Sequence, residues 1–425
     1  MVGSLLRLYK KIGTDAKVWH LYRLIKYIET FSAASVWRRN LYICCVASFV
    51  VSVGMSQMAP VLPLYIAQLG VEGIGEIARW SGIVFGCNFI SLAIFSPIWG
   101  RLADRYGRKP MILRASCWLG VIMIGMAFAQ SVWHLVALRL MQGCLSGFQA
   151  AVVPLIAQET PKEHSGWAMG MFFSAQVTGG LLGPLLGGFL AECIGIRQSF
   201  LLIGTLCLLG CLALTRVRET HRPVKQTASV GLREMFAALP HRGAIVGLFL
   251  TTLIMQFSLT CIQPILTVYV KELAPTTDHL AVIAGAVFSS SGFASMLFAS
   301  RLGHISDRVG SNRVLPACLL LAGLVSIPQG FVTAPWQLAL LRFVHGIAVA
   351  GLMPSINNLI RQLAPSSCMG RIYGFNQSFQ FIGMFSGAFL GGHLAAFFGL
   401  RHMFFFVAIL LLVDAIWCHR MERRG

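Results

Sequence analysis

Residues 100–109 read GRLADRYGRK, and residues 303–310 repeat this pattern as GHISDRVG. The same displacement of 203 or 204 residues relates further pairs: Trp133 and Trp336, Arg139 and Arg342, Gly183 and Gly387, Gly187 and Gly391, Gly188 and Gly392. The chain is therefore a duplication of one unit of about 200 residues, and each copy is mostly apolar. Duplicated hydrophobic halves are typical of membrane transporters whose substrate site lies between the repeats.

The composition predicts a membrane protein. Hydrophobic residues make up 56% of the chain and charged residues only 12%, with a mean hydropathy of +0.73. Because soluble proteins carry about 25% charged residues, this chain has too little polar surface for a water-soluble fold. A helix of roughly 20 apolar residues crosses the hydrocarbon layer, and the sequence contains twelve segments of suitable length.

We expect these segments to be helices, because backbone polar groups inside lipid must be paired within the segment. They are residues 41–69, 80–100, 111–129, 133–157, 164–193 and 198–217 in the first half, and 242–270, 280–300, 313–332, 336–361, 370–396 and 400–419 in the second. The sequence thus predicts an all-α membrane protein whose twelve transmembrane helices form two six-helix bundles related by a pseudo-twofold repeat. Its parts are a basic extension (1–40), the first bundle (41–217), a linker (218–241), the second bundle (242–420) and a tail (421–425).

The net charge of +19 is distributed by side of the membrane. With the N-terminus in the cytosol, 28 Lys and Arg fall in cytoplasmic segments, four in outer loops and two, Arg139 and Arg342, inside helices. This split follows the positive-inside rule, so we expect both termini in the cytoplasm of a bacterial inner-membrane protein and no binding of nucleic acid. For residues 1–40 two interpretations stay open: a basic amphipathic helix on the anionic leaflet, or a poorly ordered tail.

The sequence shows no pattern of catalytic or metal-ligating residues. Eleven of the twelve cysteines lie in hydrophobic segments, where Cys behaves as a small apolar side chain. Neither a CxxC pair nor a Cys/His cluster at zinc spacing occurs. Paired carboxylates, Ser/His/Asp arrangements and phosphate-binding loops are also absent. We therefore expect no enzyme activity, no metal, no cofactor and no structural disulfide.

The turn within residues 100–109 has a specific charge pattern. Gly107 permits a tight turn, and Asp104 can accept hydrogen bonds from a facing helix N-terminus or an Arg. The pattern resembles the hallmark loop between helices 2 and 3 of the major facilitator superfamily, a latch between helices 2 and 11 that stabilises the outward-open state. The resemblance assigns this role to Gly100, Asp104, Arg105, Gly107, Arg108 and Lys109, and to Asp307 and Arg308 in the degenerate second copy.

The fifth segment carries a glycine face. Gly179, Gly183 and Gly187 recur every fourth residue, so they share one side of a helix and let another backbone approach closely. Pro184 removes a backbone donor and bends the helix. With Gly188 these residues form the pattern GxxxGPxxGG, which resembles the antiporter motif of drug/proton exporters in the superfamily.

Three ionisable residues inside the segments are candidates for proton coupling. Arg139 lies deep in the fourth segment, in a sequence that resembles the family motif RxxQG, which is tied to proton transfer. A charge inside a membrane helix costs at least about 2.5 kcal/mol, so it marks a functional site by default; an Arg bonded to helix carbonyls is the alternative. Asp414, which Arg420 can neutralise, and His345 are the other titratable groups inside the bilayer.

Few polar side chains are suited to a central cavity. The candidates are Gln57, Gln142, Gln149, Gln256, Gln263, Asn357, Asn376 and Gln380. Such a neutral set suits small amphiphilic substrates. Together with the resemblance to drug/proton exporters of the superfamily, this set predicts a monomeric exporter of such molecules in exchange for protons. Export of a siderophore or another metabolite, and a transport-dead sensor or scaffold, remain as alternatives.

Overall fold

The structure is a computed structural model that describes residues 16–219, 242–365 and 369–422, and not the side chains of residues 16–35, 100, 101, 104, 370, 421 and 422. Its helices are α2 (Ala16–Ser56), α3 (Met58–Gln68), α4 (Ile74–Tyr106), α5 (Arg108–Ala127), α6 (Val132–Leu145), α7 (Phe148–Glu159), the short 3-10 helix η1 (Lys162–His164), α8 (Ser165–Cys193), α9 (Ile196–Leu214), α11 (Arg242–Leu273), α12 (Leu280–Val309), α13 (Ser311–Gln329), α14 (Pro335–Leu363), α15 (Met369–Phe398) and α16 (Leu400–Glu422).

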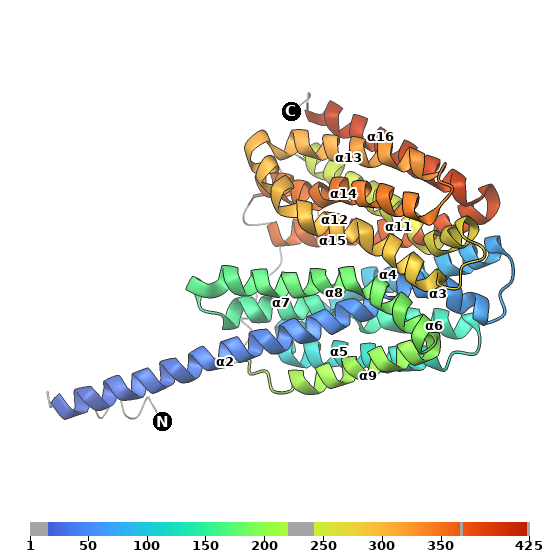
Figure 1. The fold of residues 1–425 in the computed structure, drawn as a ribbon. Coiled ribbons are helices and arrows are strands. Elements are labelled where there is room, and N and C mark those ends of the chain that lie inside the picture. The colour runs from blue at the N-terminus through green and yellow to red at the C-terminus, as the bar shows by residue number, and fades with distance from the viewer. Residues whose placement is uncertain (1–15, 220–241, 366–368, 423–425) are drawn as a thin grey trace.

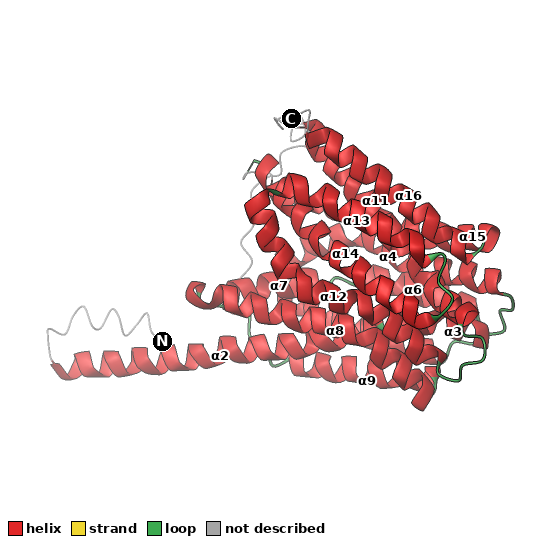
Figure 2. Ribbon diagram, turned by 45° about the horizontal axis from the view of Figure 1, so that its top comes forward, coloured by secondary structure: helices red, strands yellow, loops and turns green. Residues whose placement is uncertain are grey.

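Twelve helical segments are long and apolar enough to cross a membrane, and the part of the chain that the structure describes contains no strand (Figure 2). This confirms the predicted all-α membrane fold. The helix α2 starts at Ala16 and continues without a break into the first span. The boundary predicted at residue 40 therefore falls inside a helix, and residues 1–15 lie outside the described part.

Two of the predicted spans are interrupted. The first is divided at Gln57 between α2 and α3, three residues before Pro60, which cannot donate a backbone hydrogen bond to the preceding turn. The fourth is divided between α6 and α7, where Gly147 has a φ of 114°. That left-handed backbone favours glycine and interrupts the helical hydrogen bonds between α6 and α7.

The helices form two bundles, each around its own apolar core (Figure 1). In the first bundle α2 packs on α8, α4 on α6, and α5 on α9; in the second, α11 packs on α15, α12 on α14, and α13 on α16. Across the two bundles, α4 packs on α15 and α8 on α12. The pair α4 and α15 therefore corresponds to the pair α12 and α8 in the other repeat, as a pseudo-twofold arrangement requires.

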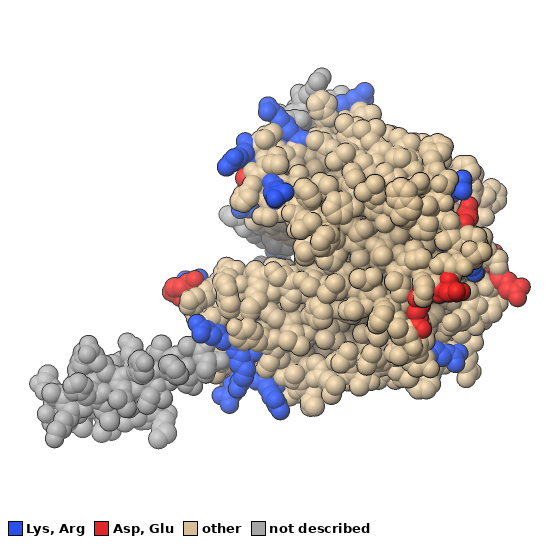
Figure 3. All heavy atoms as spheres, viewed as in Figure 1, with Lys and Arg blue, Asp and Glu red and all other residues tan. Residues whose placement is uncertain are grey.

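The bundles meet closely at the end of the molecule opposite the termini. Small residues make these contacts: Gly82 of α4 faces Ala388 and Gly392 of α15, while Gly188 of α8 faces Ala281 of α12. At the other end the space-filling surface is hollowed between the two halves, and Lys and Arg side chains lie on both halves on either side of the hollow (Figure 3). The structure is therefore closed at one end and open at the end that carries the termini.

Candidate functional site

Arg139 lies in a cage of backbone and side-chain oxygens in the first bundle. It is on α6 and only 2% exposed. Its Nε donates to the carbonyl of Val84 at 3.2 Å and its Nη2 to that of Phe85 at 3.4 Å, both on α4. Its Nη1 donates to Oε1 of Gln142 at 2.8 Å. The guanidinium thus joins α6 to α4 through neutral acceptors, which is the arrangement expected of an Arg bonded to helix carbonyls.

The second bundle places different chemistry at the equivalent positions. Arg342 and His345 on α14 stand 203 residues after Arg139 and Gln142. Arg342 and His345 are buried, and Nε of Arg342 and both ring nitrogens of His345 have no hydrogen-bond partner among the described residues. The amide of the first copy is thus replaced by a titratable ring beside the second buried Arg.

Asp414 is a buried carboxylate in the last span. It lies on α16 and is 1% exposed. Oδ1 accepts a hydrogen bond from Oγ1 of Thr251 on α11 at 3.1 Å, and Oδ2 is buried without a partner. Among the described residues Asp414 forms no ion pair with Arg420, the partner suggested by the sequence, and the side chain of Arg420 is exposed. A hydroxyl, not a cation, therefore supports this carboxylate.

The break between α6 and α7 is held by two residues that sequence reasoning did not select. The indole Nε1 of Trp99 on α4 donates to the carbonyl of Cys144, and Nη2 of Arg114 on α5 donates to that of Ser146 at 2.8 Å. The guanidinium of Arg114 also stacks 3.2 Å from the ring centroid of Trp99. These donors satisfy carbonyls that the break leaves unpaired. A charged residue inside the predicted segment 111–129 was the signal that could have identified Arg114.

The glycine face of α8 packs against α2, within the first bundle. A Cβ at Gly183 would collide with Oγ of Ser56 and lie 2.9 Å from the carbonyl of Val53. Gly179 approaches Phe49 of α2 similarly closely, and Gly187 approaches Gln57, the residue between α2 and α3. Oγ of Ser56 also lies 3.3 Å from the carbonyl of Gly179. The glycines thus allow two backbones of the same bundle to touch.

The remaining residues of this motif reach the other bundle. The carbonyl of Pro184 lies against Gly285 of α12, and Gly188 lies against Ala281 of the same helix. Gly285 and Gly188 both meet backbone atoms where a Cβ would stand, so no side chain larger than hydrogen fits at either position. One helix, α8, therefore carries two faces of small residues, one for its own bundle and one for the contact between the bundles.

The latch motif lies at the open end. Gly100 and Asp104 belong to α4, and the side chain of Asp104 lies outside the described part of the structure. Gly107 has a φ of 97° and forms the turn, and Arg105 is exposed. In the second copy Asp307 and Arg308 are exposed on the last turn of α12.

A residue that was not predicted, Glu219, holds this turn. Its carboxylate accepts the backbone N–H groups of Arg108 at 2.8 Å and Lys109 at 2.9 Å, the first two residues of α5. Nζ of Lys109 donates to the carbonyl of Thr215 at 2.8 Å. A carboxylate at a helix N-terminus pairs free donors and favours the helix dipole. Glu219 thus caps the N-terminus of α5.

The polar cavity candidates fall into different environments. Gln57 is buried beside Gly187, and neither of its amide atoms has a partner in the described part of the chain. Oδ1 of Asn376 accepts from Thr252 at 2.8 Å, which joins α15 to α11. The others are Gln142, bonded to Arg139; Gln256, buried; Gln263, Asn357 and Gln380, half-buried; and Gln149, exposed.

Comparison with known proteins agrees with this architecture. The model of the Major Facilitator Superfamily matches residues 44–247 and 248–424. A multidrug resistance protein MdtG of Dickeya zeae (strain Ech586) is 40% identical over 390 residues, which cover 91% of this chain and 95% of that protein. The MdtG of Serratia proteamaculans (strain 568) is also 40% identical, over 393 residues that cover 91% of this chain and 95% of that protein.

Solved structures share the fold at low sequence identity. The nucleoside transporter NupG superposes with a TM-score of 0.74 at 13% identity, over 90% of this chain and 99% of that one. A bacterial homologue of the human lysosomal transporter Spinster gives a TM-score of 0.71 at 14% identity, over 91% of this chain and 96% of that one. The two-bundle fold, the repeated motifs and the family match along nearly the whole chain lead to one conclusion: this chain belongs to the Major Facilitator Superfamily.

Proposed function

We propose that the protein is a secondary transporter of a bacterial inner membrane that exports small amphiphilic compounds in exchange for protons. The observation that carries the proposal is the 40% identity to multidrug resistance proteins over 91% of the chain. Two bundles that seal at one end and separate at the other supply the framework for alternating access. The same findings favour a transporter over an enzyme.

The charge distribution orients the molecule in this proposal. The end that carries the termini also gathers Lys and Arg (Figure 3), so the positive-inside rule assigns it to the cytoplasm. The structure then represents an inward-open state, in which a compound enters from the cytosol or the inner leaflet. The latch residues Asp104, Arg105 and Arg108 are therefore proposed to act in the outward-open state and not in this one.

Asp414 and His345 are the proposed proton carriers, with Asp414 the first choice. Asp414 has one oxygen bonded to Thr251 and the other unpaired in a buried site, so a neighbouring charge does not fix its ionised form. His345 lies three residues from Arg342 on the same helix, and neither of its ring nitrogens has a hydrogen-bond partner among the described residues. Arg139 is proposed to organise the path through its fork of donors rather than to titrate.

The substrate site is proposed to lie between the bundles and to be lined by neutral side chains. Gln57 supports this most directly, because an amide that is buried without partners is costly unless another state or a ligand satisfies it. The break beside Gln57 also frees backbone groups near the contact between the bundles.

Uptake of a lipophilic fluorescent amine into inverted vesicles tests this function. Energised vesicles that contain the protein should accumulate the compound, and vesicles with Gly183→Leu should not. Equal uptake by empty vesicles would reject export of this class of compound.

A further inference from the structure

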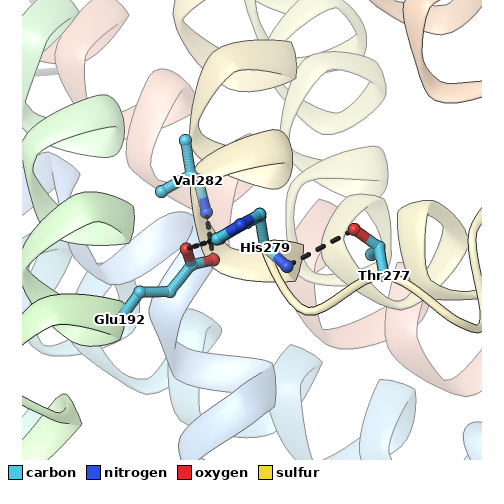
Figure 4. Close-up of polar contacts among 4 residues, drawn as sticks. All are labelled: Glu192, Thr277, His279 and Val282. Atoms are coloured by element: carbon cyan, nitrogen blue, oxygen red, sulfur yellow. Dashed lines mark hydrogen bonds and ion pairs between the residues drawn. The ribbon is translucent and has the colours of Figure 1, made fainter.

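One carboxylate bridges the two bundles at the closed end. Glu192 lies at the end of α8, in the first bundle. Its Oε1 accepts the backbone N–H of Val282 at 2.9 Å, and its Oε2 lies 3.1 Å from Nδ1 of His279 (Figure 4). His279 and Val282 belong to the second bundle, where the backbone N–H of His279 in turn donates to Oγ1 of Thr277 at 3.3 Å.

Glu192 completes the start of a helix that its own bundle leaves incomplete. The helix α12 begins at Leu280, and its N-cap residue His279 makes no capping hydrogen bond with its side chain. The N–H of Val282 belongs to the first turn, where backbone donors have no acceptor within the helix. A carboxylate that accepts such a donor forms a charge-assisted bond and is favoured by the helix dipole. The cap of α12 therefore comes from the opposite bundle.

The other contacts between α8 and α12 leave the first turn of α12 without a directional bond. Gly188 with Ala281 and Pro184 with Gly285 are contacts between small residues, and the hydrogen bond from Oγ of Ser289 to the carbonyl of Leu181 at 2.8 Å lies about two turns further along α12. The other contact between the bundles lacks a similar bond at the equivalent place: Ala396 of α15 stands 204 residues after Glu192 and lies against Gly75 of α4. The carboxylate is thus specific to the pair α8 and α12.

We propose that Glu192 is a positioning residue for transport: it holds α12 against α8 while this end is closed, and it must release Val282 and His279 when the end opens. The proposal deepens the transport function and rests on alternating access. It makes Glu192 part of the gate opposite the termini, complementary to the latch at the other end.

Thiol labelling of purified protein in detergent tests this gate without substrate or protons. Ala281 is 4% exposed, so Ala281→Cys reports opening through its reaction with a maleimide, measured by mass spectrometry of the peptide that contains residue 281. The neighbouring exposed Cys193 is removed as Cys193→Ala. Glu192→Ala in this background should raise the labelling rate about tenfold, since loss of a charge-assisted bond from one state shifts an equilibrium by about that factor.

Two variants distinguish an effect on this gate from a general destabilisation of the fold. Glu192→Gln keeps an oxygen for the N–H of Val282 and should label at an intermediate rate. Glu272→Ala is the matched control, because Glu272 pairs at 3.5 Å with Arg401 of the same bundle; its labelling rate should equal that of the parent. If Glu192→Ala does not fold, Glu192→Gln and His279→Ala carry the same comparison.

An unchanged rate in Glu192→Ala, or an equal increase in Glu272→Ala, would overturn the proposal. The labelling result can be interpreted even if the vesicle uptake experiment fails, because labelling reports only the opening of the gate.

Discussion

Arg139 donates to Gln142 at 2.8 Å, and the second repeat has Arg342 and His345 at the same two positions. Arg139 also donates to two carbonyls of α4, whereas both ring nitrogens of His345 lack hydrogen-bond partners in the described structure. The duplication has thus produced one satisfied Arg site and one unsatisfied site. The two bundles therefore differ at these equivalent positions, as expected if they have different roles in the exchange of substrate for protons.

Arg139→Lys should leave a folded protein that exports poorly. Lysine keeps the charge but cannot donate simultaneously to Val84, Phe85 and Gln142, because it lacks the planar fork of Arg. We expect an uptake rate at least about tenfold lower, which corresponds to the loss of one good charged hydrogen bond. Initial uptake rates in inverted vesicles, normalised to protein content, measure this. Full activity of Arg139→Lys would show that these hydrogen bonds of Arg139 are not needed for transport.

Gly183→Leu should lower both stability and export, and Gly180→Ala should change neither. Any Cβ at Gly183 collides with Ser56, whereas a Cβ at Gly180 meets nothing within 4 Å. Overpacking of this kind costs typically about 1–3 kcal/mol. Melting temperature in detergent and vesicle uptake should fall together in the first variant only. A Leu variant that melts and transports like the parent would contradict the packing of α8 on α2.

Glu219→Ala should destabilise the start of α5. The variant removes the acceptor for the backbone N–H groups of Arg108 and Lys109, and loss of a helix cap costs roughly 1 kcal/mol. Glu163→Ala, at an exposed position of η1, is the control. A lower melting temperature for the first variant alone is expected. Indistinguishable melting of the two variants would show that the cap contributes nothing.

Asp104→Asn should leave the melting temperature unchanged but reduce uptake strongly. The reason is that the family latch acts in the outward-open state, while the structure is open at the end where this motif lies. The variant should therefore shift the protein toward the inward-open state without unfolding it. Uptake at the parental rate would remove Asp104 from the transport cycle.

The sequence predicted the fold to a large extent and the site only in part. The repeat, the apolar segments and the glycine period are local patterns. They correctly predicted twelve helical spans and placed Gly179, Gly183 and Gly187 on one face of a helix. The break at Gly147 was missed, because a single Gly inside an apolar run also occurs in continuous helices. The features that the sequence did not reveal depend on contacts between residues far apart in the chain.

Glu219 and Glu192 illustrate the limit. Glu192 lies at the end of α8 and Glu219 in the segment after α9, and the partner of each carboxylate is more than eighty residues away in the sequence. Only packing shows that Glu219 caps α5 and that Glu192 caps α12 across the bundles. Motif comparison pointed to Asp104 for a similar task, since the family pattern contains that residue and not the residues of the following linker.

Proton-driven export is tested most directly by uptake into inverted vesicles in which the proton gradient is varied, from about pH 6 to about pH 8, the range in which a buried carboxyl or a His can change charge. Uptake should follow the gradient and stop when a protonophore is added; Asp414→Asn should bind the compound but lose this dependence, and His345→Gln should retain it. Uptake that is insensitive to the protonophore, with unchanged pH profiles in both variants, would contradict proton antiport.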